Sequence, residues 1–440
     1  MDNKILWVWL SLKISPGKMT IPALLEEYGD IEEIYREKNY TYSAYLSFKE
    51  RRSLADKSLE SAYDVCRRTD ECGAKILVYD DEKYPENLRQ IDSPPYVLYV
   101  KGKVIDWDRY LLISVIGTRD CTQYGVNVTR RIAGGLAEQG VVIVSGLAKG
   151  LDSAATAEAL RYNSYSVGVL GCSIDKIYPL ENKALYNAVE KTGILISEYP
   201  PGSNNGKSAF PLRNRIIAGI SSGLLVTEAP LRSGTNITVN YAYDYNKDVF
   251  AVPGSIFEKN NEGTNRLLKG SAKATVCAED ILEEYPDIAE RQRAPMGNIF
   301  IEELPEIEAL IESGIIKKDN KREGMGYSEY RTASGKAGRI GIGRRSVFSR
   351  KSTEIYERQQ SDKIAASEPK EQETNDKKRL PEGLSKDEKL VAEVLLGGEK
   401  MKDEIIRETA LDAGDVNTML ILLEMQGAVE VLPGNIYRLK

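Results

Sequence analysis

The feature that most constrains this chain is a regular alternation of short apolar runs and longer helical patterns between residues 75 and 285. Apolar runs such as Leu111–Gly117 and Val141–Gly146 are each followed by a stretch with apolar residues at helical spacing. Buried parallel strands need crossover connections, and a crossover is usually a helix. The alternation therefore predicts an α/β domain with a doubly wound (Rossmann-like), mostly parallel sheet.

Residues 1–73, which precede this domain, show the apolar spacing of a small helical domain. The first apolar run is too short to span a membrane and lacks a small-residue cleavage site, so we expect no membrane segment. The turn Ser15–Lys18 (SPGK) between the first two helices has two interpretations. It is either a helix-hairpin-helix-like contact to DNA or only a connector, within a domain that is SAM-like or helix-hairpin-helix-like.

Residues 286–385 lose the alternation, although residues 299–316 retain a helical pattern. Between Lys321 and Lys351, nine Lys/Arg stand against two Glu among many Gly and Ser residues. Such a composition cannot bury a core, so this linker is predicted to be largely disordered. Its basic, aromatic-dotted part either tracks a nucleic-acid backbone or is simply solvated.

Residues 386–440 contain three helical patterns and a hairpin around Pro433–Asn435, which predicts a winged-helix domain. In that fold the third helix usually reads DNA, but residues 412–426 contain no Lys or Arg. The whole segment carries seven Lys/Arg against eleven Asp/Glu. This balance favours docking to a protein over contact with a DNA groove.

The absence of histidine from all 440 residues removes several kinds of catalytic site. Ser-His-Asp, Cys-His and HExxH arrangements are excluded. The five cysteines are scattered and form no CxxC pair, so we expect neither a metal site nor a disulfide framework. This usage is typical of a reducing cytoplasm. Because the net charge is −6, any nucleic-acid footprint must be local.

In a doubly wound sheet, ligands bind beyond the carboxyl ends of the strands. Each of the six loops expected there contains glycine, which lets backbone N–H groups approach an anion closely. These loops also carry cationic side chains, and they carry hydroxyl donors such as Thr235. The residues predicted to bind phosphate or DNA are Gly117, Arg119, Ser145, Gly146, Lys149, Lys207, Phe210, Arg213, Asn214, Arg215, Ser233, Gly234 and Thr238.

The stretch Phe210–Ser221 (FPLRNRIIAGIS) places two arginines around Asn214, ahead of an apolar helical pattern. We expect a helix to begin near Asn214, so that the guanidinium groups of Arg213 and Arg215 lie at its positive end and favour an anion. Phe210 adds a face on which a base can stack. The alternative is that the arginines form ion pairs with loop carboxylates such as Glu198 and Glu228 and that Phe210 is core.

The identity of the anion is constrained by motifs that are missing. The loop Gly117–Gly125 lacks the GxGxxG dinucleotide fingerprint, and Gly202–Ser208 is one residue short of a Walker A loop. Asp152 is predicted to cap a helix at Ser153. The edge is therefore predicted to hold phosphates rather than to break bonds, and no catalytic residue is assigned.

Several of these motifs, in this order and spacing, closely resemble the DprA/Smf (DNA-processing protein A) family. They are SGLAKGLD, the Tyr178-Pro179 loop, SEYPPG, FPLRNRIIAGIS, the TEA…SGTNIT loop, AVPG and GTNRLLKG. The resemblance spans about residues 75–285, and the helical N-terminus and winged-helix C-terminus match the three-part layout of the family.

The resemblance implies a cytoplasmic bacterial protein that binds single-stranded DNA at the sheet edge and forms a homodimer through the sheet domain. It implies that the protein protects DNA and helps load RecA recombinase, typically in natural transformation, with no catalysis and no cofactor. Carried over to this chain, Arg119 and Lys207 hold phosphates and Phe210 stacks a base. Arg213 and Arg215 shape the pocket.

This chain departs from the family pattern at two positions: Thr156 stands where histidine is usual, and Lys247 where arginine is usual. Two other functions remain as alternatives. One is a nucleotide hydrolase similar to the lysine-decarboxylase-like (LOG) group, whose PGGxGTxxE loop is replaced here by RSGTNIT. The other is a nucleotide-binding sensor whose winged helix docks a protein partner.

Overall fold

The computed structural model of this chain describes residues 2–38, 40, 46–289, 301–315, 384–409, 411, 413–425, 428–432 and 436–439. The predicted basic segment, most of the predicted linker and the predicted turn at Pro433–Asn435 therefore lie outside the described residues.

The N-terminal segment is helical, as predicted. Its helices are α1 (Asn3–Lys13), α2 (Thr20–Tyr28), α3 (Ile31–Arg36), α4 (Phe48–Ala55) and α5 (Glu60–Glu71). Trp7 and Trp9 of α1 are buried, and the Trp7 indole donates to Asp80 Oδ2 at 2.6 Å. The SPGK turn packs against the sheet domain: Gly17 has φ +77°, and a Cβ there would lie 2.3 Å from Leu212 Cδ1. This packing favours the connector interpretation of the turn.

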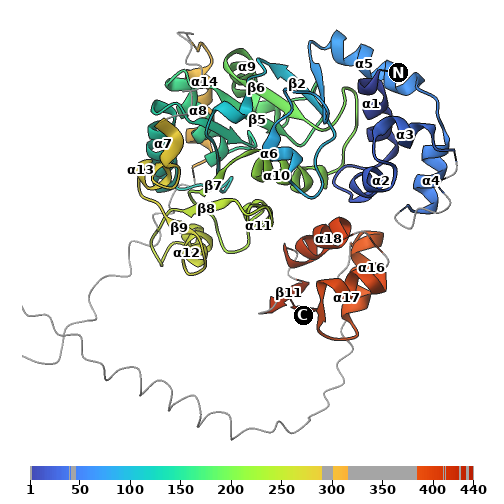
Figure 1. The fold of residues 1–440 in the computed structure, drawn as a ribbon. Helices are drawn as coiled ribbons and strands as arrows, with labels where there is room; N and C mark the ends of the chain where they lie inside the picture. The colour runs from blue at the N-terminus through green and yellow to red at the C-terminus, as the bar shows by residue number, and fades with distance from the viewer. Residues whose placement is uncertain are drawn as a thin grey trace, which may run out of the picture. The chain divides into compact units, whose positions relative to one another are not determined.

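The sheet of the second domain has nine strands among the described residues, in the order β1-β2-β6-β5-β4-β3-β7-β8-β9 (Figure 1). Strands β3 to β9 are mutually parallel, whereas β2 pairs antiparallel with both β1 and β6. The strands span Lys75–Val78, Val97–Gly102, Leu112–Ile116, Val142–Ser145, Ser166–Leu170, Ile194–Ser197, Gly223–Val226, Asp248–Ala251 and Lys273–Ala274, in chain order. The predicted doubly wound, mostly parallel sheet is confirmed.

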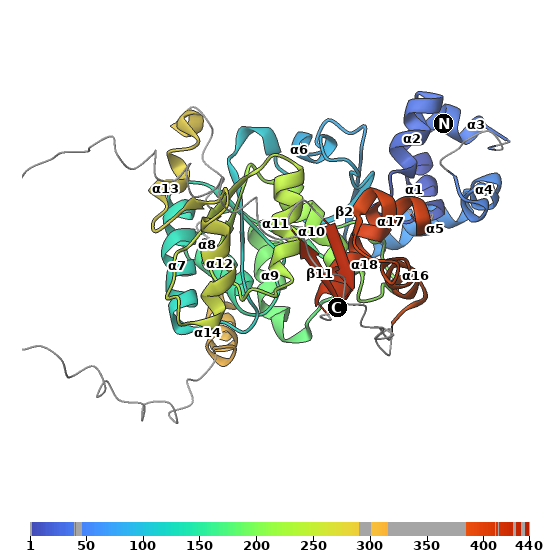
Figure 2. The same cartoon turned by 90° about the horizontal axis from the view of Figure 1, so that it is seen from below.

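Helices cover both faces of this sheet because alternate strand residues point to opposite sides. In β3, for example, Ile113 and Val115 enter one apolar cluster, and Leu112 and Ile116 enter another. Helices α7 (Gln123–Glu138), α8 (Leu151–Arg161) and α9 (Lys183–Thr192) lie on one face (Figure 1). On the other face lie α6 (Glu86–Arg89), α10 (Ala209–Ile220) and α11 (Thr235–Asp244), as Figure 2 shows from below. Two short helices, α12 (Glu262–Leu268) and α13 (Glu279–Leu282), follow.

The start of α10 corrects one prediction. The helix begins at Ala209 rather than near Asn214, because Phe210 and Pro211 belong to its first turn. Proline is tolerated there, since the first N–H groups of a helix have no intrahelical partner. Arg213 and Arg215 therefore lie beyond the first turn and not at the positive end of the helix.

Helix α14 (Leu304–Ser313) extends the sheet domain past the boundary drawn from the sequence. It packs on α8 and α9, and Ile307 and Ile311 are buried. Glu308 forms ion pairs with Arg130 of α7 and, at 2.6 Å, with Arg161 of α8. The helix predicted within residues 299–316 is confirmed over Leu304–Ser313, and this helix packs on the sheet domain rather than belonging to a linker.

The C-terminal segment forms its own small core, as predicted. It contains α16 (Lys386–Leu395), α17 (Lys402–Thr409) and α18 (Ala413–Met425). Strands β10 (Lys400–Met401), β11 (Val429–Leu432) and β12 (Ile436–Leu439) pair in the order β10-β12-β11. The core includes Leu395, Ile405 and Leu420.

None of the described helices combines enough length with enough apolar character to cross a membrane.

Candidate nucleic-acid interface

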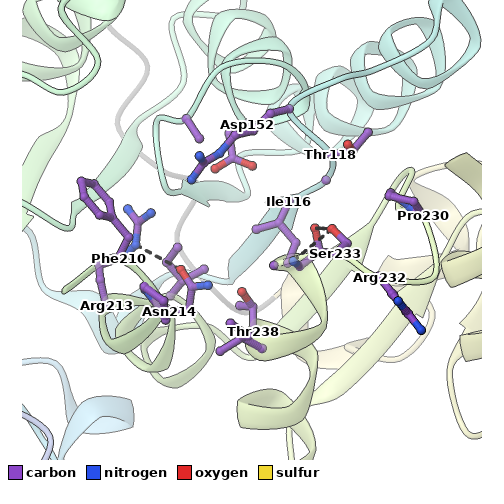
Figure 3. A pocket seen from close by; sticks show the side chains of 18 of the residues that line it. Ile116, Thr118, Asp152, Phe210, Arg213, Asn214, Pro230, Arg232, Ser233 and Thr238 are labelled. Atoms are coloured by element: carbon purple, nitrogen blue, oxygen red, sulfur yellow. Dashed lines mark hydrogen bonds between the residues drawn. The ribbon is translucent and has the colours of Figure 1, made fainter. Parts of the chain in front are cut away.

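A cavity of about 380 Å³ opens at the carboxyl ends of β3 and β7 (Figure 3). From β3 the chain winds outward through β4, β5 and β6, then returns to β7 on the other side of β3. This reversal is the topological switch point, where open α/β sheets bind ligands. Figure 3 shows Phe210, Arg213 and Asn214 on one side of the cavity and Ser233 and Arg232 on the other.

The loop after β3 supplies an exposed cation. Gly117, Thr118 and Arg119 line the cavity, and the Thr118 N–H donates to the Glu228 carbonyl at 2.8 Å. Arg119 is exposed, and within the described parts of the chain its side chain forms no ion pair. It is therefore free to pair with an anion that enters the cavity.

Glu228 holds this loop instead of pairing with an arginine, which corrects a sequence expectation. Its carboxylate is buried and accepts hydrogen bonds from the Thr122 N–H at 2.9 Å and the Thr122 hydroxyl at 2.7 Å. Its effect is to fix the start of α7 next to the loop that carries Arg119.

Arg213 is almost completely buried and binds the backbone of two strand ends. Its guanidinium donates to the carbonyl of Gly146 at 3.0 Å and to that of Val169, and its Nε donates to Asn214 Oδ1 at 3.2 Å (Figure 3). Burial lowers the pKa of Arg213, although nearby Asp152 opposes this shift. Arg213 lines the cavity but mainly sets the positions of the loops after β4 and β5.

Asp152 lies beside Arg213 and was predicted to be a helix cap. Helix α8 instead begins at Leu151, with Gly150 at the cap position, and the Asp152 carboxylate accepts from the Gly146 N–H at 3.2 Å. Burial raises the pKa of Asp152, partly offset by the charge of Arg213. Asp152 is the acidic side chain deepest in this cavity, where it reduces the positive charge offered to an anion.

Arg215 does not reach the cavity. Its side chain is 1% exposed and contacts Glu198 Oε1 at 2.5 Å. Burial lowers the pKa of Arg215, but Glu198 and neighbouring tyrosines more than offset this, so the pKa stays above its ordinary value. Arg215 therefore forms an ion pair with a loop carboxylate, which was the alternative to anion binding considered from the sequence.

The most exposed edge of the site combines an aromatic pair with a lysine. The Phe210 ring is half-buried, and its centroid lies 4.9 Å from that of Tyr178. Gly171 makes this possible, since a Cβ there would lie 2.6 Å from Phe210 Cδ1. Lys207 is exposed three residues earlier, in the turn before α10.

The start of α11 adds hydroxyl groups opposite Phe210. The Ser233 hydroxyl donates to Thr235 Oγ1 at 2.9 Å, and Gly234 and Thr238 also line the cavity. Ser145, in contrast, is fully buried, and its hydroxyl donates to the Val115 carbonyl at 3.2 Å.

The predicted site residues therefore fall into three groups. Eight of them surround the cavity: Gly117, Arg119, Phe210, Arg213, Asn214, Ser233, Gly234 and Thr238. Gly146 and Lys149 line an adjoining cavity. Ser145, Lys207 and Arg215 line neither cavity, although Lys207 is exposed beside the site. A DNA-binding role for any of these residues remains a prediction.

Thr118, Arg232 and Tyr178 were not assigned to the site but border its two cavities. Arg232 follows β7 within a loop already recognised as anion-binding, so its charge was a usable signal. Tyr178 stands in a loop noted for its motif, but its approach to Phe210 depends on the fold.

The two departures from the family pattern lie away from the cavity. The buried Thr156 hydroxyl donates to the Asp152 carbonyl at 3.0 Å within α8. Lys247 Nζ lies 3.4 Å from Asn87 Oδ1, and burial lowers its pKa. In the described segments, moreover, no three His, Cys, Asp or Glu side chains are grouped so that they could hold a metal ion.

The fold and the site together define an α/β protein with an anion-accepting edge at its switch point, followed by a winged helix. Residues 75–286 match the family described as DNA recombination-mediator protein A, and residues 368–435 match the DprA winged helix domain. The chain belongs to the DprA/Smf family of DNA-processing proteins, whose role is that of a DNA recombination mediator.

Individual relatives support this assignment. Protein Smf of Synechocystis sp. is 32% identical over 367 residues, which cover 83% of this chain and 80% of that protein. The DNA processing protein DprA of Streptococcus pneumoniae is 39% identical over 205 residues, covering 47% of this chain and 72% of that protein. The X-ray structure of DprA from Streptococcus pneumoniae superposes with a TM-score of 0.55 at 31% identity, covering 64% of this chain and 98% of that chain.

Proposed function

We propose that this chain binds single-stranded DNA along the carboxyl edge of its sheet and thereby acts as a recombination mediator. The observation that carries the proposal is the set of exposed groups at the switch point. Arg119 and Lys207 present exposed charges, and the Phe210 ring lines the cavity together with Arg119. Cations that track phosphates and aromatic faces that accept unpaired bases are the two parts of a single-strand site.

Holding a strand, rather than cleaving it, is supported by the engagement of three carboxylates near the cavity. Glu228 braces Thr122, Glu198 pairs with Arg215, and Asp152 accepts from a backbone N–H. Each of these acids has a structural partner, and none is positioned as a free general base. We therefore propose a binding function for this edge.

Fluorescence anisotropy with the full chain tests the proposal. Single-stranded oligonucleotide binds, the affinity falls as salt rises, and a duplex of the same length binds more weakly because its bases are stacked and unavailable to Phe210. Equal affinity for duplex and single strand would overturn the assignment of Phe210.

The finer biological role also belongs to this proposal. We infer that the chain forms a homodimer through its sheet domain, protects the strand, and helps load RecA recombinase during natural transformation. Sedimentation tests the dimer. Loading is tested by following the growth of RecA filaments on an oligonucleotide that this protein already covers. The control is the same oligonucleotide covered by a single-strand-binding protein that does not load RecA, and growth slower than on this control would contradict loading.

One observation favours a second candidate, a nucleotide-binding sensor. The cavity volume of about 380 Å³ lies in the range of small-molecule pockets. Tight binding of a nucleoside monophosphate with no binding of oligonucleotides would favour the sensor over the mediator.

A further inference from the structure

A second cavity adjoins the first at Phe210. It has a volume of about 460 Å³ and is formed by the loops after β4 and β5 together with the start of α10. The two cavities share Arg119, Ala148, Phe210 and Arg213. A strand held in the first cavity therefore has a continuous path into the second.

The second cavity differs from the first in chemistry, because aromatic and aliphatic side chains form much of its wall. Tyr178 and Leu180 line it and are 55% and 76% exposed. The Tyr178 ring meets that of Phe210 at an angle of 43°. Large apolar groups left exposed beside an anion-accepting edge are surfaces on which an unpaired base can stack.

Buried hydrogen bonds hold these walls in place. The Tyr186 hydroxyl donates to the Tyr178 carbonyl at 2.9 Å. The Asn182 side chain, in the 3₁₀ turn Leu180–Asn182, donates to the Leu147 carbonyl at 2.6 Å. The loop that carries Tyr178 is therefore fixed to the loop after β4, so a ligand does not have to order it.

An ion pair also borders the second cavity. Lys149 Nζ lies 2.8 Å from Glu181 Oε1, and the two side chains are 44% and 55% exposed. Pairs this exposed contribute little and are readily exchanged. Because a phosphate oxygen accepts from an ammonium group as well as a carboxylate does, a strand entering here can take Glu181's place.

We propose that the second cavity binds one unpaired nucleobase, stacked on Tyr178 and Phe210, and that the Lys149–Glu181 pair opens so that Lys149 contacts the adjoining phosphate. This inference rests on the proposed function, since the first cavity must hold the strand. A nucleobase is favoured over a protein side chain because the aromatic wall is continuous with the cationic edge at Phe210 and Arg119.

Two oligomers of equal length distinguish the contribution of the bases to binding from that of the phosphates. One is oligo-dT, and the other is an abasic oligomer that keeps the deoxyribose-phosphate backbone but has no bases. In anisotropy titrations with the full chain, Tyr178→Ala weakens oligo-dT binding by about fivefold or more and leaves the abasic oligomer unchanged. Lys207→Ala weakens both by the same factor. Tyr178→Phe, which keeps the ring, behaves as the unsubstituted protein.

The outcomes distinguish the two levels of the proposal. Tyr178→Ala that weakens both oligomers alike, or neither, overturns the base subsite while single-strand binding stands. If the unsubstituted protein binds neither oligomer, the proposed function fails and the subsite fails with it.

A second pair of variants tests the opening of the ion pair. Glu181→Gln removes the competitor of the phosphate and strengthens binding of both oligomers by about twofold to threefold. Lys149→Ala weakens both and lowers the slope of log affinity against log salt by about 0.7, because one phosphate is no longer neutralised. Weaker binding by Glu181→Gln would show that Glu181 supports the site rather than competes for Lys149.

Discussion

The two faces of helix α10 use the same kind of residue for different purposes. Toward the cavity, Phe210 and Arg213 lie at the ends of β4 and β5, with the exposed Lys207 just before the helix. On the other face, Arg215 is sealed from solvent against Glu198. Charge in a phosphate-binding motif is therefore not a measure of phosphate contact. The buried arginines build the edge, and the exposed cations beside them are available to a strand.

The largest expected effect comes from removing the buried arginine of the Arg215–Glu198 ion pair. Arg215→Met leaves Glu198 in the interior without its ion-pair partner, so we expect the free energy of unfolding to fall by about 3–5 kcal/mol. Urea denaturation measures it. The matched control is Arg119→Ala, an exposed arginine, which should stay within about 0.5 kcal/mol of the unsubstituted protein. Equal losses of stability for the two variants would contradict the division between building and binding arginines.

The next effect concerns the aromatic ring on the exposed face. Phe210→Leu keeps an apolar side chain of similar reach but removes the ring, and we expect it to cost about 1–3 kcal/mol of single-strand affinity. Phe210→Tyr retains the ring and should bind normally. Anisotropy at constant salt gives both values. Full affinity for Phe210→Leu would mean that bases do not stack at this position.

The smallest expected effect is a pH dependence of strand binding that arises from Asp152, which lines the cavity. Burial raises the pKa of Asp152 above its ordinary value of 3.8. An anion in the cavity favours the neutral carboxyl, so binding takes up a proton and affinity rises as the pH falls through the folded-state pKa. Asp152→Asn should bind somewhat more tightly at neutral pH and lose this dependence. A pH series of anisotropy titrations that is identical for both proteins would exclude Asp152 as its source.

The raised pKa of Asp152 also affects stability. Because the folded pKa is raised, the native state binds more protons than the unfolded state in the window just above pH 3.8. The contribution of Asp152 to the free energy of unfolding therefore falls as the pH rises through that window. Asp152→Asn removes this slope.

The sheet could be predicted from the sequence because its evidence is local. Runs such as Leu111–Gly117 are buried strands whichever partners they pair with, and the helical spacing between them requires crossovers. The position of α14 could not be predicted in this way. Its place in the core depends on Glu308 meeting Arg130 and Arg161, which are far away in the sequence.

The candidate site was predictable as a set of loops but not residue by residue. Arg213 and Arg215 are two positions apart, and on a helix with 3.6 residues per turn this places them on nearly opposite faces. That inference needed the true start of α10 at Ala209. Tyr178 could not be placed in the site from local sequence at all, because only the packing of the loops brings its ring to Phe210.

The most direct test of the central claim is the salt dependence of single-strand binding for Arg119→Ala/Lys207→Ala beside Arg215→Met, each measured where it is folded. If the exposed cations hold the phosphates, the double variant lowers the slope of log affinity against log salt by about 1.4, or 0.7 for each cation removed. Arg215→Met then keeps the slope of the unsubstituted protein. An unchanged slope for the double variant, or a reduced slope for Arg215→Met, would contradict the account.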